Sequence, residues 1–297
     1  MHPTLPLPAL SDRPNTRRCL LTAFATLLVA VLALSGCAAG NSADEPASES
    51  SPGASSSTTE AAVKVPKAPR NGACYRLDVR DAAKSASTAD PVPCTKPHTT
   101  KTIHVGRLGA EGKVAPDFRN ASVRDRLTAT CNREAHAFLG GDLADRRLSR
   151  LQVVWFAPTQ QELAEGARWM RCDVLALGRS DSLMTLPRLK MQGVLDRAAG
   201  ADTFGLCGTA SPGTRGFERV ACGLRHSWAA ISTIPISDAK RYPGVAKVRA
   251  AGDQACSDQV NARTSELKFA YGWEWPTLAQ WKAGQRFGYC WAPASLA

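Results

Sequence analysis

Two cysteine–histidine pairs in this sequence share one spacing. Cys94 stands four residues before His98, and Cys222 stands four residues before His226. Thiolate sulfur and imidazole nitrogen are common zinc ligands, so these pairs raise the hypothesis of a metal site. Zinc sites normally bring two cysteines close together in sequence, which neither pair does. We therefore expect no metal and no cofactor. His98 and His226 are candidate binding residues, with a structural role beside a disulfide as the alternative.

The rest of the sequence carries no recognised catalytic pattern. It contains neither Gly-x-Ser-x-Gly nor His-Glu-x-x-His, which place a nucleophile or a metal in known hydrolases. Glu274 lies between Trp273 and Trp275. A single carboxylate, however, supplies only one of the groups that acid–base hydrolysis requires. The sequence therefore predicts a protein that is not an enzyme and has no catalytic residues.

The cysteine–histidine pairs belong to a longer pattern that occurs twice. Each copy contains Gly-x-Cys, then Cys-x(3)-His, then a third cysteine, and it ends in Trp-x-x-Pro-Thr and a fourth cysteine. With an offset of 118 residues, Trp155 aligns with Trp273 and Cys172 aligns with Cys290. Internal repetition of this kind indicates two copies of one structural module.

The duplication restricts how the cysteines of the two copies can pair. Eight cysteines allow about a hundred pairings, but only three remain if bonds form within each copy and both copies are alike. The first two cysteines are separated by 20 residues in one copy and by 15 in the other, which a disulfide-closed hairpin permits. We therefore predict the bonds Cys74–Cys94, Cys131–Cys172, Cys207–Cys222 and Cys256–Cys290.

The second copy is richer in aromatic residues than the first. Tyr271, Trp275, Tyr289 and Trp291 align with non-aromatic residues of the first copy. Aromatic rings on a surface can stack on a sugar or hold a peptide, so these four are candidate binding residues. The alternative is a core repacked with larger side chains.

Hydrophobic spacing predicts matching elements in the two copies. Apolar residues at helical spacing indicate long helices over 123–138 and 245–260, with the third cysteine of each copy on the buried side. Runs of β-prone residues indicate strands at 99–108, 151–156 and 228–236. The predicted elements therefore alternate between the two types within each copy.

Short helices are expected near the end of each copy. Thr159 with Glu162, and Thr277 with Gln280, have the spacing of a capping box, which begins a helix. The predicted order in each module is then β-β-β-α-β-α-β, and residues 183–195 form strands or a bridge between modules. The fold class is α+β. We expect two tandem pseudo-repeats, each a small mixed or antiparallel sheet with one long and one short helix, stapled by disulfides.

The N-terminal segment has the layout of an export signal. Arginines precede an apolar run that ends in Leu-Ser-Gly-Cys37, which resembles the lipobox of bacterial lipoproteins. We expect residues 1–36 to be a signal peptide and Cys37 to carry diacylglycerol, with palmitate among its acyl chains. An uncleaved membrane helix is the alternative. Residues 37–70 are rich in Ser, Ala, Pro and Gly and are expected to form a disordered tether. The first module then covers 71–196 and the second 197–297.

The charge balance is basic, with a net charge of +11 at pH 7. A basic protein favours anionic partners. On the outer face of the cytoplasmic membrane, where the lipid anchor would hold it, such partners are lipid headgroups, anionic envelope polymers, and division or envelope proteins. No nucleic acid is expected, since no nucleic-acid-binding motif is present.

The twin motifs resemble the septum formation family of actinobacterial envelope proteins. The match is clearest at Gly72-Ala-Cys74-Tyr75 and at Val92-Pro-Cys94-Thr-Lys-Pro-His98, and it weakens in the second copy. The resemblance implies a membrane-anchored protein linked to cell division or envelope assembly. We therefore expect a non-catalytic binding or scaffolding lipoprotein. The alternatives are an amidase-like cell-wall hydrolase and a ligand-sensing accessory lipoprotein.

Overall fold

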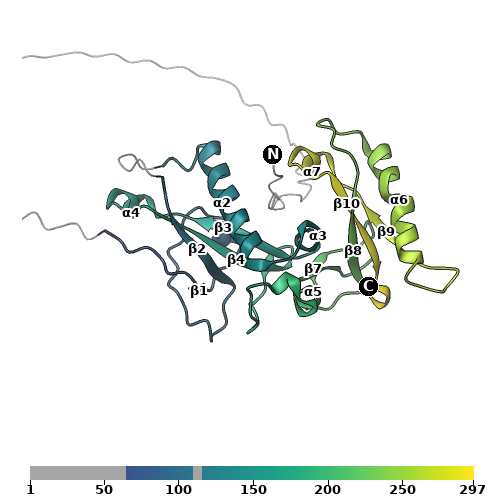
Figure 1. Cartoon of the computed structure of the whole chain (residues 1–297), viewed down its shortest axis with the longest axis horizontal. Coiled ribbons are helices and arrows are strands. Elements are labelled where there is room, and N and C mark those ends of the chain that lie inside the picture. The colour runs from purple at the N-terminus through teal and green to yellow at the C-terminus, as the bar shows by residue number, and fades with distance from the viewer. Residues whose placement is uncertain (1–64, 110–115) are drawn as a thin grey trace, which may run out of the picture. The chain divides into compact units, whose positions relative to one another are not determined.

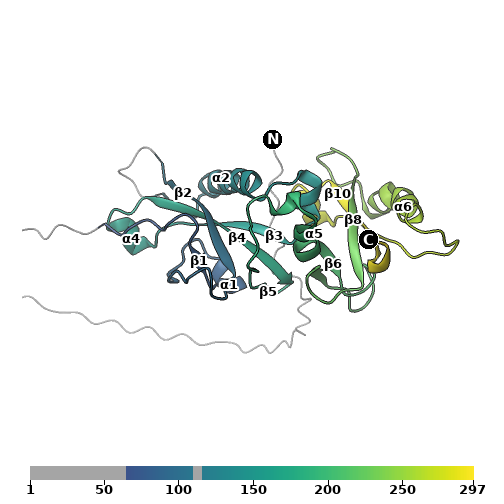
Figure 2. The ribbon, with the colours of Figure 1, turned by 60° about the horizontal axis from the view of Figure 1, so that its bottom comes forward.

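The computed structural model describes residues 65–109 and 116–297. The expected signal peptide (1–36), Cys37 and nearly all of the expected tether (37–70) lie outside these residues. Of the helices in the described part of the chain, none is both long and apolar enough to cross a membrane. The described chain forms two successive α+β halves, each with its own sheet (Figure 1, Figure 2).

The sheet of the first half is antiparallel in all of its strand pairs. Its strand order is β1-β2-β4-β3, and β5 pairs with the C-terminal end of β4. The long strand β4 is therefore central. The strands are β1 (Cys74–Tyr75), β2 (Thr100–Arg107), β3 (Leu151–Phe156), β4 (Trp169–Arg179) and β5 (Ser182–Leu183).

The sheet of the second half repeats this arrangement. Its order is β7-β6-β8-β10-β9, so β6-β8-β10-β9 corresponds to β1-β2-β4-β3. A β-bulge is repeated as well, because the register skips Ile103 between β2 and β4 and skips Ile231 between β8 and β10. The prediction of tandem α+β repeats is confirmed. The strands are β6 (Leu206–Gly208), β7 (Arg219–Ala221), β8 (Trp228–Pro235), β9 (Gly272–Glu274) and β10 (Phe287–Pro293).

One long helix packs on a face of each sheet. Helix α2 (Ala121–Leu139) begins where the Asn120 side chain accepts a hydrogen bond from the amide of Ser122 at 2.9 Å. Helix α6 (Val245–Asn261) buries Val248 and Cys256. In each half the third cysteine lies on the buried side of the helix, as the spacing predicts.

A tryptophan on the edge strand joins each sheet to its helix. Trp273 in β9 donates from Nε1 to the carbonyl of Val248, and its counterpart Trp155 donates to the Thr128 hydroxyl. A β-carbon at Gly252 in α6, or at Gly288 in β10, would lie 2.3 Å from the Trp273 ring. Glycine at these two positions therefore lets the ring fit between the helix and the sheet.

The short helices begin at the predicted capping boxes. In α4 (Gln160–Ala164), Thr159 and Glu162 bond reciprocally to each other's backbone amides. Thr277 and Gln280 do the same at α7 (Leu278–Lys282). This part of the prediction is confirmed in both halves.

The first half departs from the predicted order of elements. It adds α1 (Val79–Ala82) and α3 (Leu143–Arg147), and the expected second strand is reduced to one bridge between Cys74 and Val92. Val92 lies between Pro91 and Pro93, which have no amide proton for a ladder. The order β-β-β-α-β-α-β is therefore right for the second half and wrong for the first.

The connections between the long helix and the edge strand also differ. In the first half this connection contains α3, whereas in the second half residues 262–271 form no helix or strand. Leu267, near the middle of that loop, is 100% exposed. Helix α3 therefore has no counterpart in the second half.

The segment after β5 completes the core of the first half. It contains the 3-10 helix η1 (Val194–Asp196) and helix α5 (Ala198–Phe204). Leu186, Val194 and Phe204 pack with Val174 of β4 in one cluster under α2. Residues 183–195 thus include the last residue of β5 and a packed segment that closes this core. The chain ends in a second 3-10 helix, η2 (Ala294–Leu296).

Each half is cross-linked internally by two disulfides. In each half one bond joins the long helix to strand β4 or its equivalent β10, and another joins the first strand to a nearby loop. Their Cα–Cα distances are 5.0–5.3 Å. The bonds are Cys74–Cys94, Cys131–Cys172, Cys207–Cys222 and Cys256–Cys290, the four pairs that the duplication predicts.

Removal of a helix-to-strand disulfide should destabilise the protein more than removal of a short-loop disulfide. The Cys131–Cys172 bond closes a separation of 41 residues and the Cys207–Cys222 bond one of 15. Replacing each pair by alanine should lower the free energy of unfolding by about 4 and about 3 kcal/mol, because the longer loop regains more freedom in the unfolded chain. Denaturant unfolding without reductant measures both values. A larger loss for the shorter loop would contradict this explanation.

Candidate functional site

The two histidines of the Cys-x(3)-His motifs are bound to their own backbone. His98 Nδ1 lies 2.9 Å from the carbonyl oxygen of Lys96, and His226 Nδ1 lies 2.8 Å from that of Leu224. A carbonyl only accepts, so Nδ1 is the donor in both rings. His98 is only 6% exposed, whereas His226 is half-buried. The same bond at equivalent positions supports the structural alternative for both.

The cysteines of these motifs are not metal ligands, because both sulfurs are in disulfides. Across residues 65–109 and 116–297, no three histidine, cysteine or acidic side chains come together as a metal site. The sulfur atoms therefore act in folding.

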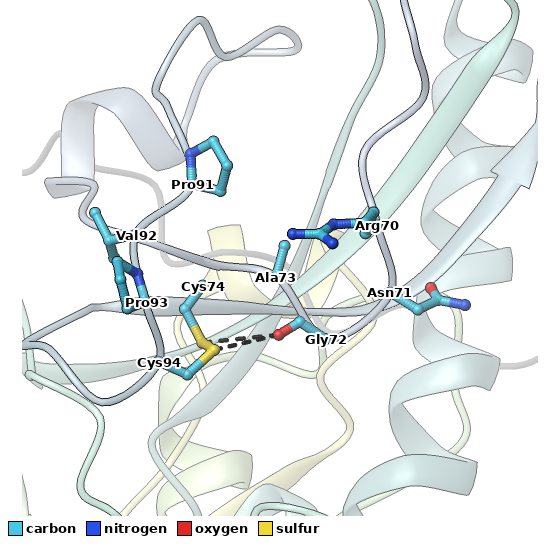
Figure 3. A pocket seen from close by; sticks show the side chains of 9 residues that line it. All are labelled: Arg70, Asn71, Gly72, Ala73, Cys74, Pro91, Val92, Pro93 and Cys94. Carbon is cyan, nitrogen blue, oxygen red and sulfur yellow. Dashed lines mark hydrogen bonds between the residues drawn. A yellow bond between two sulfur atoms is a disulfide. The ribbon is translucent and has the colours of Figure 1, made fainter.

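A pocket of about 270 Å³ lies beside the Cys74–Cys94 bond. Figure 3 shows the carbonyl of Gly72 directed at the two sulfurs, at 3.3 Å from Cys94 and 3.9 Å from Cys74. Arg70 is the one charged residue among those that line the pocket. This lining provides contact surface without a nucleophile or a general base.

The aromatic candidates of the second half separate into two groups. Trp291 is 0% and Tyr289 7% exposed, so their rings are part of the core and the interpretation of them as added surface is wrong. Tyr271 and Trp275 are half-buried. The Arg249 guanidinium lies over the Trp275 ring, 5.6 Å from its centre. Of these four residues, only Tyr271 and Trp275 offer a ring face to a ligand. Although the Tyr289 ring is core, its hydroxyl oxygen is not fully buried.

The buried rings lie on the face of the second sheet opposite α6, together with an ion pair. Glu274 accepts from Arg219 Nη2 at 2.7 Å and from Trp291 Nε1 at 3.1 Å. The Arg219 guanidinium lies 5.1 Å from the centre of the Tyr289 ring. Burial acts to lower the pKa of Arg219, but Glu274 and Tyr289 outweigh it and the pKa is raised. Arg219 is therefore held in its charged form.

The first half has the same kinds of side chain on the equivalent face of its own sheet, but they stand at different aligned positions. Arg171, aligned with Tyr289, lies between rings: its guanidinium is 3.8 Å from the centre of Tyr75 and 4.7 Å from that of Phe156. Asp173, aligned with Trp291, accepts from the Thr102 hydroxyl at 2.7 Å, and burial raises its pKa. Each half thus buries an arginine, a carboxylate and aromatic rings here.

A glycine explains how the second half accommodates its larger ring. Gly208 occupies the position of Tyr75, and a β-carbon there would lie 2.8 Å from Phe217 and 3.3 Å from Trp291. Because Gly208 in β6 has no ring where the first half has Tyr75, there is space for the Trp291 ring of β10. The sequence contained this signal in the aligned pair of Tyr75 and Gly208.

The end of α3 packs on this face of the second sheet, so the two halves meet there. The Arg147 guanidinium lies 3.9 Å from the centre of the Phe287 ring, and Leu148 packs in the same cluster. Leu206 donates its amide to the Leu148 carbonyl at 2.6 Å. Figure 1 shows α3 next to β7 and β8. The sequence did not predict this junction.

The neighbourhood of the junction is rich in arginine. Arg150 is buried and donates from Nε to the Leu177 carbonyl at 3.2 Å and from Nη2 to the Arg179 carbonyl at 3.3 Å. Arg179 itself pairs with Glu218 at 2.6 Å. The junction of the two halves therefore brings several arginines and two glutamates together, and it is the candidate binding site.

Loss of the Glu274 charge should destabilise the second half. In Glu274→Gln, Arg219 keeps its charge but loses a carboxylate partner in a largely buried site, so we expect the free energy of unfolding to fall by about 2 kcal/mol. Asp81→Asn is the matched control, since Asp81 and Lys84 form an exposed pair and should contribute little. Denaturant unfolding compares the two. Similar small effects from both substitutions would show that the Glu274 pair is not stabilising.

Comparison with known proteins agrees with the repeated motifs. The family model for septum formation matches residues 44–155 and again residues 144–290. No curated protein and no solved structure matched the chain. The two matches together span most of the sequence and support a role in septum formation or the cell envelope. The chain belongs to the septum formation family.

Proposed function

We propose that this chain is a lipid-anchored, non-catalytic binding or scaffolding protein on the outer face of the cytoplasmic membrane. It would act in septum formation or envelope assembly by presenting a rigid surface to other envelope components. The observation that carries the proposal is the set of four disulfides within a duplicated fold. Such bonds persist in oxidising compartments, which lie outside the cytoplasm.

The position of Cys37 supports the anchoring part of the proposal. It follows an apolar run and the residues Leu-Ser-Gly, as a lipidated cysteine does. Anchoring at Cys37 would leave the whole folded part, from residue 71 onward, on the outer side of the membrane. The basic balance of the chain fits partners there that carry negative charge.

The environment of the acidic and histidine side chains supports a binding role over a catalytic one. Glu274 is held by Arg219 and Trp291, and the carboxylate of Asp173 is fully buried. His98 and His226 use a ring nitrogen on their own backbone. General acid–base catalysis needs a proton-transferring group that can reach the substrate. The two carboxylates are engaged or buried and His98 is buried, so these three do not meet that need, whereas the half-buried His226 keeps its Nε2.

Lipid attachment is tested by substitution of Cys37. Cys37→Ala should abolish incorporation of radiolabelled palmitate and should move the protein out of the membrane fraction, because the thiol that accepts the lipid is gone. Cys19→Ala, within the expected signal peptide, is the control and should keep the label. Label retained by Cys37→Ala would refute the anchor.

The scaffolding role is tested by crosslinking in dividing cells followed by purification of the tagged chain. We expect envelope or division proteins to be recovered with the wild type. Wall fragments incubated with the pure protein should release no product. Product release that is lost in Glu274→Gln or His98→Ala would instead establish a cell-wall hydrolase.

A further inference from the structure

The junction carries more positive than negative charge. Four arginines and two glutamates lie around it. The arginines come from α3, from the residue before β3, from the end of β4 and from β7. The arginines are Arg147, Arg150, Arg179 and Arg219, called the junction arginines below; the glutamates are Glu218 and Glu274. The surplus is two positive charges.

Both glutamates are already fully engaged. Glu218 accepts from Arg179 Nη1 with one oxygen and from the Ser180 amide, at 3.2 Å, with the other. Glu274 uses one oxygen for Arg219 and the other for Trp291. Each oxygen of the two carboxylates therefore already accepts one hydrogen bond.

The two remaining junction arginines have no acidic partner within the described part of the chain. Arg147 makes no ion pair or hydrogen bond there and only stacks on Phe287. Arg150 binds backbone carbonyls, which carry no net charge. Burial, and then the charge of Arg219, lower the pKa of Arg150 to about 10. This arginine is therefore in a place where a negative charge would be favourable.

A hydroxyl group lies among these charges without a partner. Tyr289 is 7% exposed, and its hydroxyl has no hydrogen-bond partner in residues 65–109 or 116–297. The hydroxyl oxygen is not fully buried, because the fully buried unpartnered side-chain atoms of these residues belong to Arg168, Trp169 and Arg171. Its ring packs edge-on against Phe287, over which Arg147 stacks, and Arg219 lies on the ring itself. Burial raises the pKa of Tyr289, so the hydroxyl keeps its proton and can donate it.

We propose that the junction binds a phosphate group, with the Arg147 guanidinium and the Tyr289 hydroxyl as its direct donors. Arg150, whose charge acts on Tyr289, supplies the further positive charge. Inorganic phosphate and phosphate monoesters carry a charge of about −1.5 to −2 at neutral pH, which matches the surplus, and a phosphodiester carries about −1. The planar fork of arginine fits its oxygens, and each charge-assisted hydrogen bond is stronger than a neutral one. The site goes beyond the proposed function and does not depend on lipid attachment.

Calorimetric titration of the full chain in detergent with inorganic phosphate, at constant ionic strength, tests this site. Wild type should bind phosphate. Arg147→Gln should weaken binding by roughly tenfold or more and Tyr289→Phe by a smaller factor, since the first removes a charged donor and the second a neutral one. Arg80→Gln, an exposed arginine of the short helix α1, removes the same charge elsewhere and should bind like wild type.

Two results would overturn the proposal. One is the absence of phosphate binding by wild type at millimolar concentrations. The other is Arg147→Gln protein that binds phosphate as wild type does. Thermal unfolding of each variant shows whether it folds. Tyr289→Phe, which keeps the buried ring, provides the second test if Arg147→Gln does not fold.

A second titration identifies the source of the phosphate group. Glycerophosphoglycerol, a phosphodiester headgroup without acyl chains, is compared with inorganic phosphate. Tighter binding of the diester assigns the site to a lipid headgroup or a phosphodiester polymer, and tighter binding of inorganic phosphate assigns it to the free ion. Both results support the site, whereas failure of both probes to bind excludes it and leaves the anchoring proposal untouched.

Discussion

The disulfide between the long helix and strand β4, or its equivalent β10, governs the arrangement of each half. Cys172 lies opposite Trp155 on one neighbouring strand and His104 on the other, and its sulfur reaches Cys131 in α2. Cys290 has the same place in the second sheet and bonds to Cys256. Because this bond fixes the helix against one face, the residues that alternate with the cysteine must lie on the opposite face. Arg171 and Asp173, and Tyr289 and Trp291, are those residues.

The opposite face is where the two halves have diverged. In the first half it is closed by Tyr75 and by α1 with its loop, and its charges are balanced by one arginine and one aspartate. In the second half it is closed from outside by the end of α3. A covering element that comes from another module brings its own charges with it. This explains why the arginine surplus is found at the junction and not within either half.

Sequence reasoning worked where the signal was local or repeated. The capping boxes at Thr159 and Thr277, the helical position of the third cysteine and the duplication itself follow from short spacings. Prediction from the sequence failed where the position of an element or a side chain depended on tertiary packing. The five residues of α3 are too few to show periodicity, so nothing in them indicates the surface on which they pack. The aromatic excess of the second copy made Tyr289 and Trp291 candidates for a binding surface, with a repacked core as the alternative. They align with the polar residues Arg171 and Asp173. Those polar residues are themselves buried, which the sequence alone does not show.

Helix α3 also bears on how such a protein arises by duplication. The first copy contributes Arg147 and Leu148 to the junction, and the second copy contributes Phe287, Tyr289 and Arg219. Neither copy holds both sets, so the surface is composite and exists only where the two copies meet. Both copies are therefore needed to form the surface at the junction.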